Sequence, residues 1–250
     1  MDPDPNRPPD TTEPAGVAAM FDRIAPVYDA MNAVISGFQE PRWRRRAVAA
    51  TGLQAGMTAL DVATGTGKVA MALADRVGPS GRVTGVDLAP RMIDRARRHD
   101  RGSHPWLRFV VGDALDLPVD DASVDAVTIA FGMRNLPDHA RGFAELRRVV
   151  RPGGVVVCLE IARPANLVGR VGRVWFERVV PMLGSLIGQG DAYRYLVTSV
   201  RAYPSPERIA EVMRDIGLVD VAWTALTSGM VTIHTGRRGL DDEDSGAPAR

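Results

Sequence analysis

Strand-like and helix-like segments alternate through the middle of this 250-residue chain, and this alternation is what most constrains its fold. The strand-like runs are 58–63, 82–87, 107–111 and 124–130, and helical spacing covers 68–77 and 90–99 between the first three. Parallel strands cannot be joined by tight turns and need a crossover, which is usually a helix. The alternation therefore predicts a parallel sheet with helices packed on its faces.

The remainder of the chain adds three strands and changes the pattern at its end. Its segments are a helix at 138–150, a turn at 151–154, a buried strand at 155–160, helical segments at 167–186 and 206–216, and β-rich runs at 219–226 and 230–235. Two consecutive strands with no helix between them predict an antiparallel hairpin. We therefore expect an α/β fold with a mostly parallel seven-stranded sheet and an antiparallel edge hairpin.

Both ends of the chain have the composition of disordered tails. Residues 1–15 include five prolines and show no apolar periodicity, and residues 239–250 are rich in Asp, Glu, Gly and Pro. Between these tails we expect one domain, 16–238, which starts with a helical segment at 16–50. A second helical segment, at 163–200, is predicted to form a lid.

Charge and cysteine content exclude several classes of protein. With 31 Lys and Arg against 30 Asp and Glu, the net charge of +1 argues against a nucleic-acid binder that works by bulk charge. The one cysteine, Cys158, cannot form an internal disulfide, and no Cys/His cluster suggests zinc or another metal. The longest apolar runs are too short to span a membrane, and no secretion signal is present. We therefore expect a cytoplasmic protein, in contact with a membrane at most peripherally.

A glycine-containing loop follows the first predicted strand. Asp61 lies near the end of that strand, and Gly65, Thr66 and Gly67 lead into a helix. In this arrangement backbone N–H groups reach a ligand at a helix N-terminus. Gly65, Gly67 and Ala70 also satisfy the G-x-G-x-x-A fingerprint of dinucleotide-binding proteins. The loop alone therefore predicts a nucleotide cofactor without choosing between NAD and S-adenosylmethionine (SAM).

Carboxylates at three successive strand ends separate the two cofactors. Asp87, after the second strand, suits the ribose hydroxyls of either one, although it could instead cap the next helix. Asp113 and Ala114, after the third strand, offer a carboxylate and backbone groups to an adenine edge. Asp61 would position the cationic amino-acid part of SAM and would repel the pyrophosphate of NAD. The three strand ends together favour SAM.

Four further blocks resemble the signatures of the ubiquinone/menaquinone C-methyltransferases. They are Tyr28-Asp29-Ala-Met-Asn32, Phe131-Gly-Met-Arg134-Asn135, and the segments 148–160 and 193–199. The resemblance covers nearly all of residues 17–238. It implies the Rossmann-like fold of class I SAM-dependent methyltransferases, C-methylation of demethylmenaquinol to menaquinol, and SAM contacts at Thr66, Asp87, Asp113 and Ala114.

The chain departs from the pattern of this family at three positions. Ala130 stands where the family often has Ser before Phe-Gly-x-Arg-Asn, and Ala162 stands where Ser is usual two residues after Glu160. Glu40 takes the place of a His three residues before Trp43. These departures leave the exact acceptor open, including the choice between naphthoquinol and benzoquinol.

Methylation of a ring carbon needs an electron-rich acceptor, which a hydroquinone becomes when a hydroxyl loses its proton. Arg134 has the charge and the donors to hold the resulting phenolate, with Asn135 as a neutral partner. Asp29 is a candidate base if burial raises its pKa, and Tyr28 lies beside it in the sequence. The alternative interpretation gives Arg134 a structural ion pair and packs Tyr28 against the sheet.

The segment 163–190 mixes arginines with large apolar residues at helical spacing. A basic amphipathic lid would suit a prenylated naphthoquinol substrate that resides in a membrane, whereas an ordinary helix covering the sheet would show the same pattern. Two other functions stay open: a secondary-metabolite methyltransferase of the same fold, and an NAD(P)-dependent oxidoreductase. The sequence does not indicate an oligomeric state.

Overall fold

The computed structural model describes residues 14–162 and 190–240. Its strands are β1 (Thr58–Val62), β2 (Arg82–Asp87), β3 (Leu107–Val111), β4 (Val124–Ala130), β5 (Val150–Ile161), β6 (Leu218–Leu226) and β7 (Val231–Arg238). Its α-helices are α1 (Pro14–Ile24), α2 (Tyr28–Ile35), α3 (Glu40–Ala50), α4 (Lys68–Val77), α5 (Pro90–Asp100), α6 (His139–Val149), α9 (Gly190–Ala202) and α10 (Pro206–Asp215). Short 3₁₀ helices are η1 (Met133–Asn135) and η3 (Thr227–Gly229).

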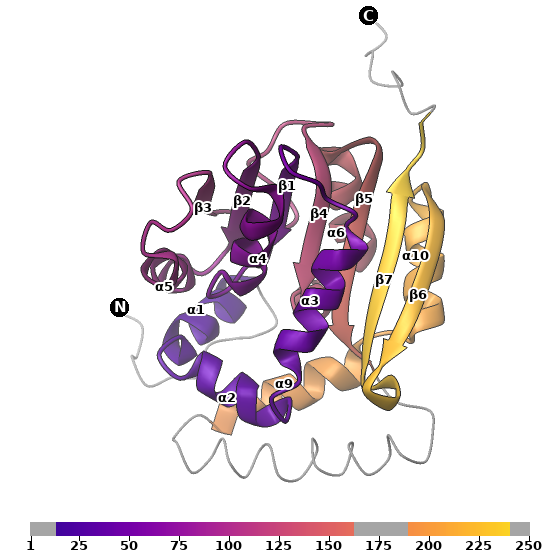
Figure 1. Ribbon diagram of the computed structural model, residues 1–250. Coiled ribbons are helices and arrows are strands. Elements are labelled where there is room, and N and C mark those ends of the chain that lie inside the picture. Colours follow the sequence, from indigo (N-terminus) through magenta and orange to yellow (C-terminus); the bar gives the residue numbers. More distant parts are fainter. Residues whose placement is uncertain (1–13, 163–189, 241–250) are drawn as a thin grey trace, which may run out of the picture.

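All of these strands form a single seven-stranded sheet with the order β3-β2-β1-β4-β5-β7-β6 (Figure 1). The pairs from β3 to β5 are parallel, and β7 pairs antiparallel with both β5 and β6. The predicted mostly parallel sheet with an antiparallel edge hairpin is confirmed. The strand order reverses at β1 and β4, which is where an open α/β sheet opens a crevice at its carboxyl edge.

Helices cover both faces of the sheet, which explains why the central strands are apolar on both sides. Helices α3, α4 and α5 pack on one face, where the cluster includes Trp43, Leu73 and Ile93. Helices α6 and α10 cover the other face around Phe143 and Ile209. Successive strand residues therefore belong to different halves of the core.

Local sequence explains where several helices begin and end. The Asp138 carboxylate accepts the backbone N–H of Arg141 at 2.9 Å and caps α6. Ser205 caps α10 in the same way, with Pro206 at the first helical position. Gly78, with a φ of +65°, ends α4. These caps satisfy backbone groups that would otherwise lack partners.

Two sequence expectations need correction. The turn expected at 151–154 lies inside β5, where pairing with β4 shifts register between Val124 and Ala126. Helix α1 begins at Pro14, inside the segment expected to be a tail. The other tail residues, 1–13 and 241–250, and the lid residues 163–189 lie outside the described part of the chain.

Helices α1, α2 and α9 cross the carboxyl edge of the sheet, below the strand ends in Figure 1. They therefore stand over the loops in which the sequence places its candidate site residues. Among the helices of residues 14–162 and 190–240, none is long and apolar enough to cross a bilayer.

Candidate active site

The loop between β1 and α4 has the conformation that its glycines permit. Gly65 and Gly67 both have positive φ, +56° and +82°, which other residues adopt only with strain. A Cβ on Gly67 would lie 2.8 Å from the ring of Phe109, so Gly67 lets the loop pack closely on β3. A Cβ on Gly65 would meet only a Tyr28 ring carbon, at 3.9 Å, and Gly65 lines a cavity. The two glycines thus serve different purposes, and only Gly65 faces a ligand site.

That cavity, of about 780 Å³, is here called the cofactor cavity. Its lining includes Phe21, Tyr28, Gly65, Asp87, Ala89, Gly112, Asp113, Ala114, Phe131, Gly132 and Asn135. The ends of four strands, β1 to β4, contribute to it together with α1 and α2. Most of the residues predicted to bind a cofactor are therefore brought together at the carboxyl edge.

Asp87 lies at the centre of the hydrogen bonds around the cofactor cavity. Its Oδ2 accepts the backbone N–H of Gly65 at 2.7 Å, and its Oδ1 accepts that of Ala89 at 2.9 Å. Burial raises the pKa of Asp87, although these two bonds act in the opposite direction. Asp87 does not cap α5, because the Arg91 N–H in the first turn goes to Asp22 at 2.8 Å. Each Asp87 oxygen can still accept a second bond from a ligand.

Asp113 shapes the far end of the same cavity. Its Oδ1 accepts the backbone N–H of Leu115 at 2.9 Å, and the N–H of Gly112 reaches the Asp87 carbonyl at 3.0 Å. These bonds hold the turn after β3 so that Asp113 and Ala114 both line the cavity.

Asp61 lines a separate small cavity of about 320 Å³, here called the small cavity. Its two carboxylate oxygens accept the hydroxyls of Thr64 and Thr128, each at 2.6 Å. Burial raises the pKa of Asp61 to about 6, and both hydroxyls oppose that rise. Arg44 and Lys68 line the same space. The small cavity thus offers one carboxylate and two positively charged side chains to a ligand that carries both charges.

The predicted role of Asp29 as a base required a raised pKa, and the structure indicates a lowered one. Burial works to raise its pKa, but Lys68 at 2.7 Å and the Thr66 hydroxyl at 2.9 Å hold the pKa below its usual value. Arg95 lies 3.4 Å away. Asp29 thus links α2 to α4 and α5, and its lowered pKa makes it a weaker base than an ordinary aspartate. Thr66, expected to contact the cofactor, gives its hydroxyl to Asp29 and lines only the small cavity.

We expect Asp29→Asn to loosen the N-terminal helices over the cofactor cavity. The substitution removes the negative charge that Lys68, Thr66 and Arg95 contact. A hydrogen bond to a charged group contributes about 1.5–3 kcal/mol to stability. Limited proteolysis should cut the segment around α1 and α2 faster. Asp94→Asn, which breaks an exposed pair with Arg97, is the matched control and should leave cleavage unchanged. Equal cleavage of both variants would contradict this fastening role.

A third cavity, of about 880 Å³, lies on the other side of the same strand ends and is here called the apolar cavity. Its lining includes Met20, Phe21, Ile24, Tyr28, Asn32, Ile35, Glu40, Trp43, Phe131, Arg134, Tyr195, Leu196 and Met230. Phe21, Tyr28 and Phe131 line the cofactor cavity as well. These three aromatic side chains form a common wall between the two cavities.

Phe131 reaches this wall through an unusual backbone conformation. Its φ is +58°, and that of Ala63, at the end of the neighbouring strand β1, is +52°. Such conformations cost about 1–3 kcal/mol each for residues other than glycine and persist where the surroundings fix them. A Cβ on Gly132 would lie 2.4 Å from that of Ala63, so the two turns are also tightly packed. The sequence pattern showed the Phe-Gly pair but not this strain.

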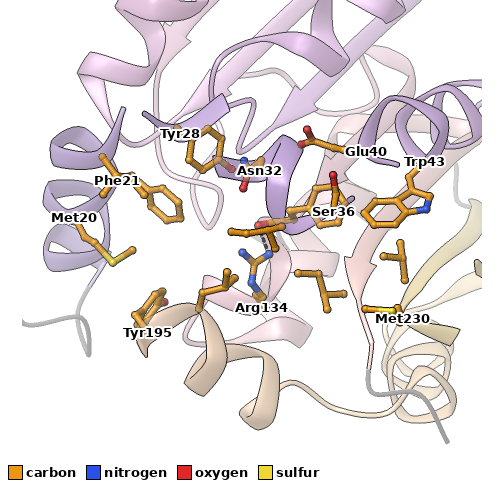
Figure 2. Close-up of a pocket in the computed structure, with 16 residues that line it drawn as sticks. Met20, Phe21, Tyr28, Asn32, Ser36, Glu40, Trp43, Arg134, Tyr195 and Met230 are labelled. Carbon is orange, nitrogen blue, oxygen red and sulfur yellow. Dashed lines mark hydrogen bonds between the residues drawn. The ribbon is translucent and has the colours of Figure 1, made fainter. Parts of the chain in front are cut away.

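Arg134 projects from η1 into the apolar cavity (Figure 2). Its Nη1 lies 2.7 Å from Oε1 of Glu160, whose Oε2 accepts the Arg134 backbone N–H at 3.2 Å. The arginine side chain is 6% exposed and the carboxylate 0%. The Nε of Arg134 is buried with no hydrogen-bond partner in the described residues. The ion pair therefore fixes the guanidinium while leaving donor capacity for a ligand.

Glu160 is a residue whose role the sequence analysis missed. It is the second-last residue of the apolar strand β5, and a lone carboxylate there needs a buried partner. That requirement was the available signal, but the partner comes from a different strand end and cannot be read from spacing.

Asn135 was expected beside Arg134 at the acceptor but lines the cofactor cavity instead. Because η1 turns between the two residues, their side chains diverge to opposite sides of the aromatic wall. The amide Nδ2 makes a long contact of 3.4 Å with the Phe131 carbonyl, and the buried Oδ1 has no partner among the described residues. This unpaired oxygen is available to a bound cofactor.

Tyr28 lies where the cofactor, small and apolar cavities meet. Burial raises the pKa of its hydroxyl, against the lowering effects of the Arg134 charge and of hydrogen bonding to Asn32. The phenol therefore stays protonated at neutral pH and serves as a hydrogen-bond donor. Tyr28 packs against Met20, Ile24 and Ala25 and also lines the cavities, so the packing interpretation does not exclude a role at the site.

Similar solved structures share this fold. The [4+2]-cyclase SpnF superposes with a TM-score of 0.69 at 18% identity, over 93% of this chain and 97% of that chain. A SAM-dependent methyltransferase from Aquifex aeolicus gives a TM-score of 0.55 at 18% identity, over 77% and 88%. At such identities the similarity concerns the fold alone.

Sequence relatives are much closer. A demethylmenaquinone methyltransferase of Thermus thermophilus is 46% identical over 221 residues, which are 88% of this chain and 100% of the relative. That of Deinococcus radiodurans is 45% identical, over 88% and 91%. The ubiquinone/menaquinone biosynthesis C-methyltransferase UbiE of Geobacter sulfurreducens is 40% identical, over 88% of each. The family model of the ubiE/COQ5 methyltransferases matches residues 10–238. The chain therefore belongs to the ubiE/COQ5 methyltransferase family.

Proposed function

We propose that this protein transfers the methyl group of SAM to a ring carbon of demethylmenaquinol, giving menaquinol and S-adenosylhomocysteine. The observation that carries the proposal is the pair of cavities that share one aromatic wall. Carboxylates and backbone groups line the cofactor cavity and suit a nucleoside, whereas the apolar cavity suits an aromatic ring with an apolar tail. The names of the relatives from Thermus and Deinococcus agree with this choice of acceptor.

The described residues fit the parts of SAM. Asp87 would accept the ribose hydroxyls, and Asp113 with Ala114 would face the adenine. In the small cavity Asp61 would hold the ammonium group and Arg44 the carboxylate, since Arg44 Nε is buried there with no partner among the described residues. SAM supplies, when bound, a methyl group already activated on a positively charged sulfur.

With the donor activated, the protein has mainly to align the reactants and to stabilise the charge that develops on the acceptor oxygen. Arg134 would do the second, because its position in the apolar cavity is fixed by Glu160. Tyr28 and Phe131, in the common wall, would hold the ring edge toward the cofactor. The apolar lining excludes water, which strengthens the contact between the guanidinium and the oxyanion.

Methyl transfer to demethylmenaquinol is the direct test. Purified protein is incubated with SAM carrying a deuterated methyl group and with short-chain demethylmenaquinol kept reduced. Mass spectrometry should find the labelled methyl group on the ring carbon. Quinone profiling of a strain without this gene should show demethylmenaquinone in place of menaquinone. A benzoquinol substrate run in parallel decides whether both rings are accepted. A lack of label on demethylmenaquinol would refute the proposal.

We expect Asp87→Ala to weaken S-adenosylhomocysteine binding by about 1.5–3 kcal/mol, because bonds to a charged acceptor are lost. Calorimetry measures the change, and NADH in a parallel titration tests the oxidoreductase alternative. Asp113→Ala serves as a comparison, since it removes a carboxylate from the other end of the same cavity. An unchanged affinity for Asp87→Ala would move the ribose elsewhere, and tight binding of NADH alone would favour the oxidoreductase.

We also propose where in the cell this protein acts. A prenylated acceptor resides in the bilayer, so the protein would work in the cytoplasm, with peripheral contact to the inner face of the membrane. The support is the chemistry of the acceptor and the basic amphipathic pattern of 163–190, most of which lies outside the described part of the chain.

A further inference from the structure

We propose that Glu40 accepts the proton of the acceptor hydroxyl, a role left without a residue once Asp29 is excluded. The inference rests on the proposed function and adds the base that the reaction requires. Glu40 is the first residue of α3 and is 5% exposed. Its side chain lines the apolar cavity together with Tyr28, Asn32 and Arg134, and Figure 2 shows these side chains around one space.

The contacts of Glu40 leave one oxygen available. Its Oε1 is paired with Arg44, one turn along α3, and no hydrogen bond occupies Oε2 within the described residues. Glu160, by contrast, accepts three N–H groups, two from Arg134 and one from Ile161. Asp61 has both oxygens bound to threonines. Of these three carboxylates, Glu40 is the one that lines the apolar cavity with an oxygen free of hydrogen bonds from the described residues.

The charges around Glu40 set the pH range in which it can work. Burial raises its pKa, and Asp29 adds to that effect, while Arg44 and Lys68 lower it. Its place in the first turn of α3 also favours the anion through the helix dipole. Arg134 and the Tyr28 hydroxyl line the same cavity. The raised pKa makes this carboxylate a stronger base than an ordinary glutamate, which suits proton transfer from a phenol.

The step balances without a further reactant. The O–H bond of the quinol breaks, its proton goes to Glu40, and the electron pair spreads to the neighbouring ring carbon. That carbon bonds to the methyl group while the S–CH₃ electron pair returns to sulfur. The ring carbon then loses its own hydrogen as a proton to water, and the proton on Glu40 returns to the oxygen. One proton is released for each methyl group transferred.

Glu40→Gln tests the proposal by single-turnover methyl transfer at saturating SAM. We expect the rate to fall about 10²-fold or more, the contribution of a general base, while S-adenosylhomocysteine affinity stays within a few-fold. Glu40→Asp keeps a charge for Arg44 and should fold, with an intermediate rate. Glu145→Gln is the matched control, because it also neutralises a carboxylate paired with an arginine, Arg148, but lies outside the cavities described above.

Two readouts separate proton transfer from a structural role. The wild-type rate should decline toward acid pH as Glu40 takes up a proton, and Glu40→Gln should lack this decline. An acceptor whose hydroxyl is already ionised at the assay pH, such as a naphthol with an electron-withdrawing substituent, should reduce the deficit of Glu40→Gln to a few-fold. An equal deficit with both acceptors, or a Glu40→Gln rate near that of the wild type, would overturn the proposal. If wild-type protein fails to methylate demethylmenaquinol, the proposed function itself is wrong.

Discussion

Arg134→Ala is expected to lower kcat about 10²–10³-fold, comparable to the loss of one oxyanion-hole donor. The contact that it removes becomes strongest as negative charge develops on the acceptor oxygen, so the chemical step should suffer more than binding. Arg134→Lys keeps the charge without the planar fork and should recover only part of the loss. Affinity for S-adenosylhomocysteine should change less than a few-fold in both variants, because Arg134 lines the apolar cavity.

The buried pair with Glu160 complicates this experiment and supplies its control. Alanine at position 134 leaves a 0%-exposed carboxylate without its arginine, which costs about 3–5 kcal/mol of folding free energy. The double variant Arg134→Met with Glu160→Gln removes both charges and should recover most of that stability. It should still be as slow as Arg134→Ala. Thermal unfolding and kcat measured on all variants then separate folding from catalysis. Near wild-type turnover in every variant would make Arg134 structural.

The fold was predictable because the signals that determine it are local and periodic. Apolar runs and helical spacing mark β1 to β5 and the helices between them, and the parallel order follows from the crossovers. The hairpin was predictable because no helix separates its strands. The bulged start of β5 was not, because Gly153 and Gly154 also read as a turn, and only pairing with β4 shows that the strand continues through them.

The positions of site residues were predictable where these residues follow the ends of parallel strands. Roles that depend on contacts with residues from other elements were less predictable. Asp87 and Asp113 follow β2 and β3 in the sequence, so parallel pairing alone brings them to one edge. Asp29 was assigned a role that depended on its pKa. The groups that lower this pKa include Lys68 and His99, which lie on helices that no spacing rule connects to α2. Adjacent residues also diverged: Arg134 and Asn135 lie on opposite sides of the aromatic wall.

Glu40 illustrates a third case. In the sequence, Glu40 was only a departure from a family pattern that often has His at this position. That departure alone did not predict a role for the side chain. The structure adds the apolar cavity, the pairing with Arg44 and the free oxygen, from which its chemistry can be argued. A substitution in a motif gains meaning when its surroundings are known.

The binding of S-adenosylhomocysteine should depend on pH through Asp61. Burial raises the pKa of this carboxyl to about 6, and only the ionised form attracts the ammonium group of the ligand. Affinity should therefore be constant above about pH 7 and decline as pH falls through about 6. Since the bound ammonium lowers the pKa of Asp61, the decline continues until the pKa of the complex is reached.

Two variants test whether Asp61 is the titrating group. Asp61→Asn should lose about 2–5 kcal/mol of binding free energy at neutral pH, the cost of breaking a buried charge pair, and its affinity should be nearly flat near pH 6. Thr128→Val keeps the charge but removes a hydroxyl that lowers the pKa, so the midpoint of the decline should move upward. At higher pH this variant should bind close to normally. Calorimetry between about pH 5 and 8 measures all three proteins. If the wild type and Asp61→Asn lose affinity in parallel, the titrating group lies elsewhere, and Asp87, whose pKa burial also raises, is the next carboxyl to replace.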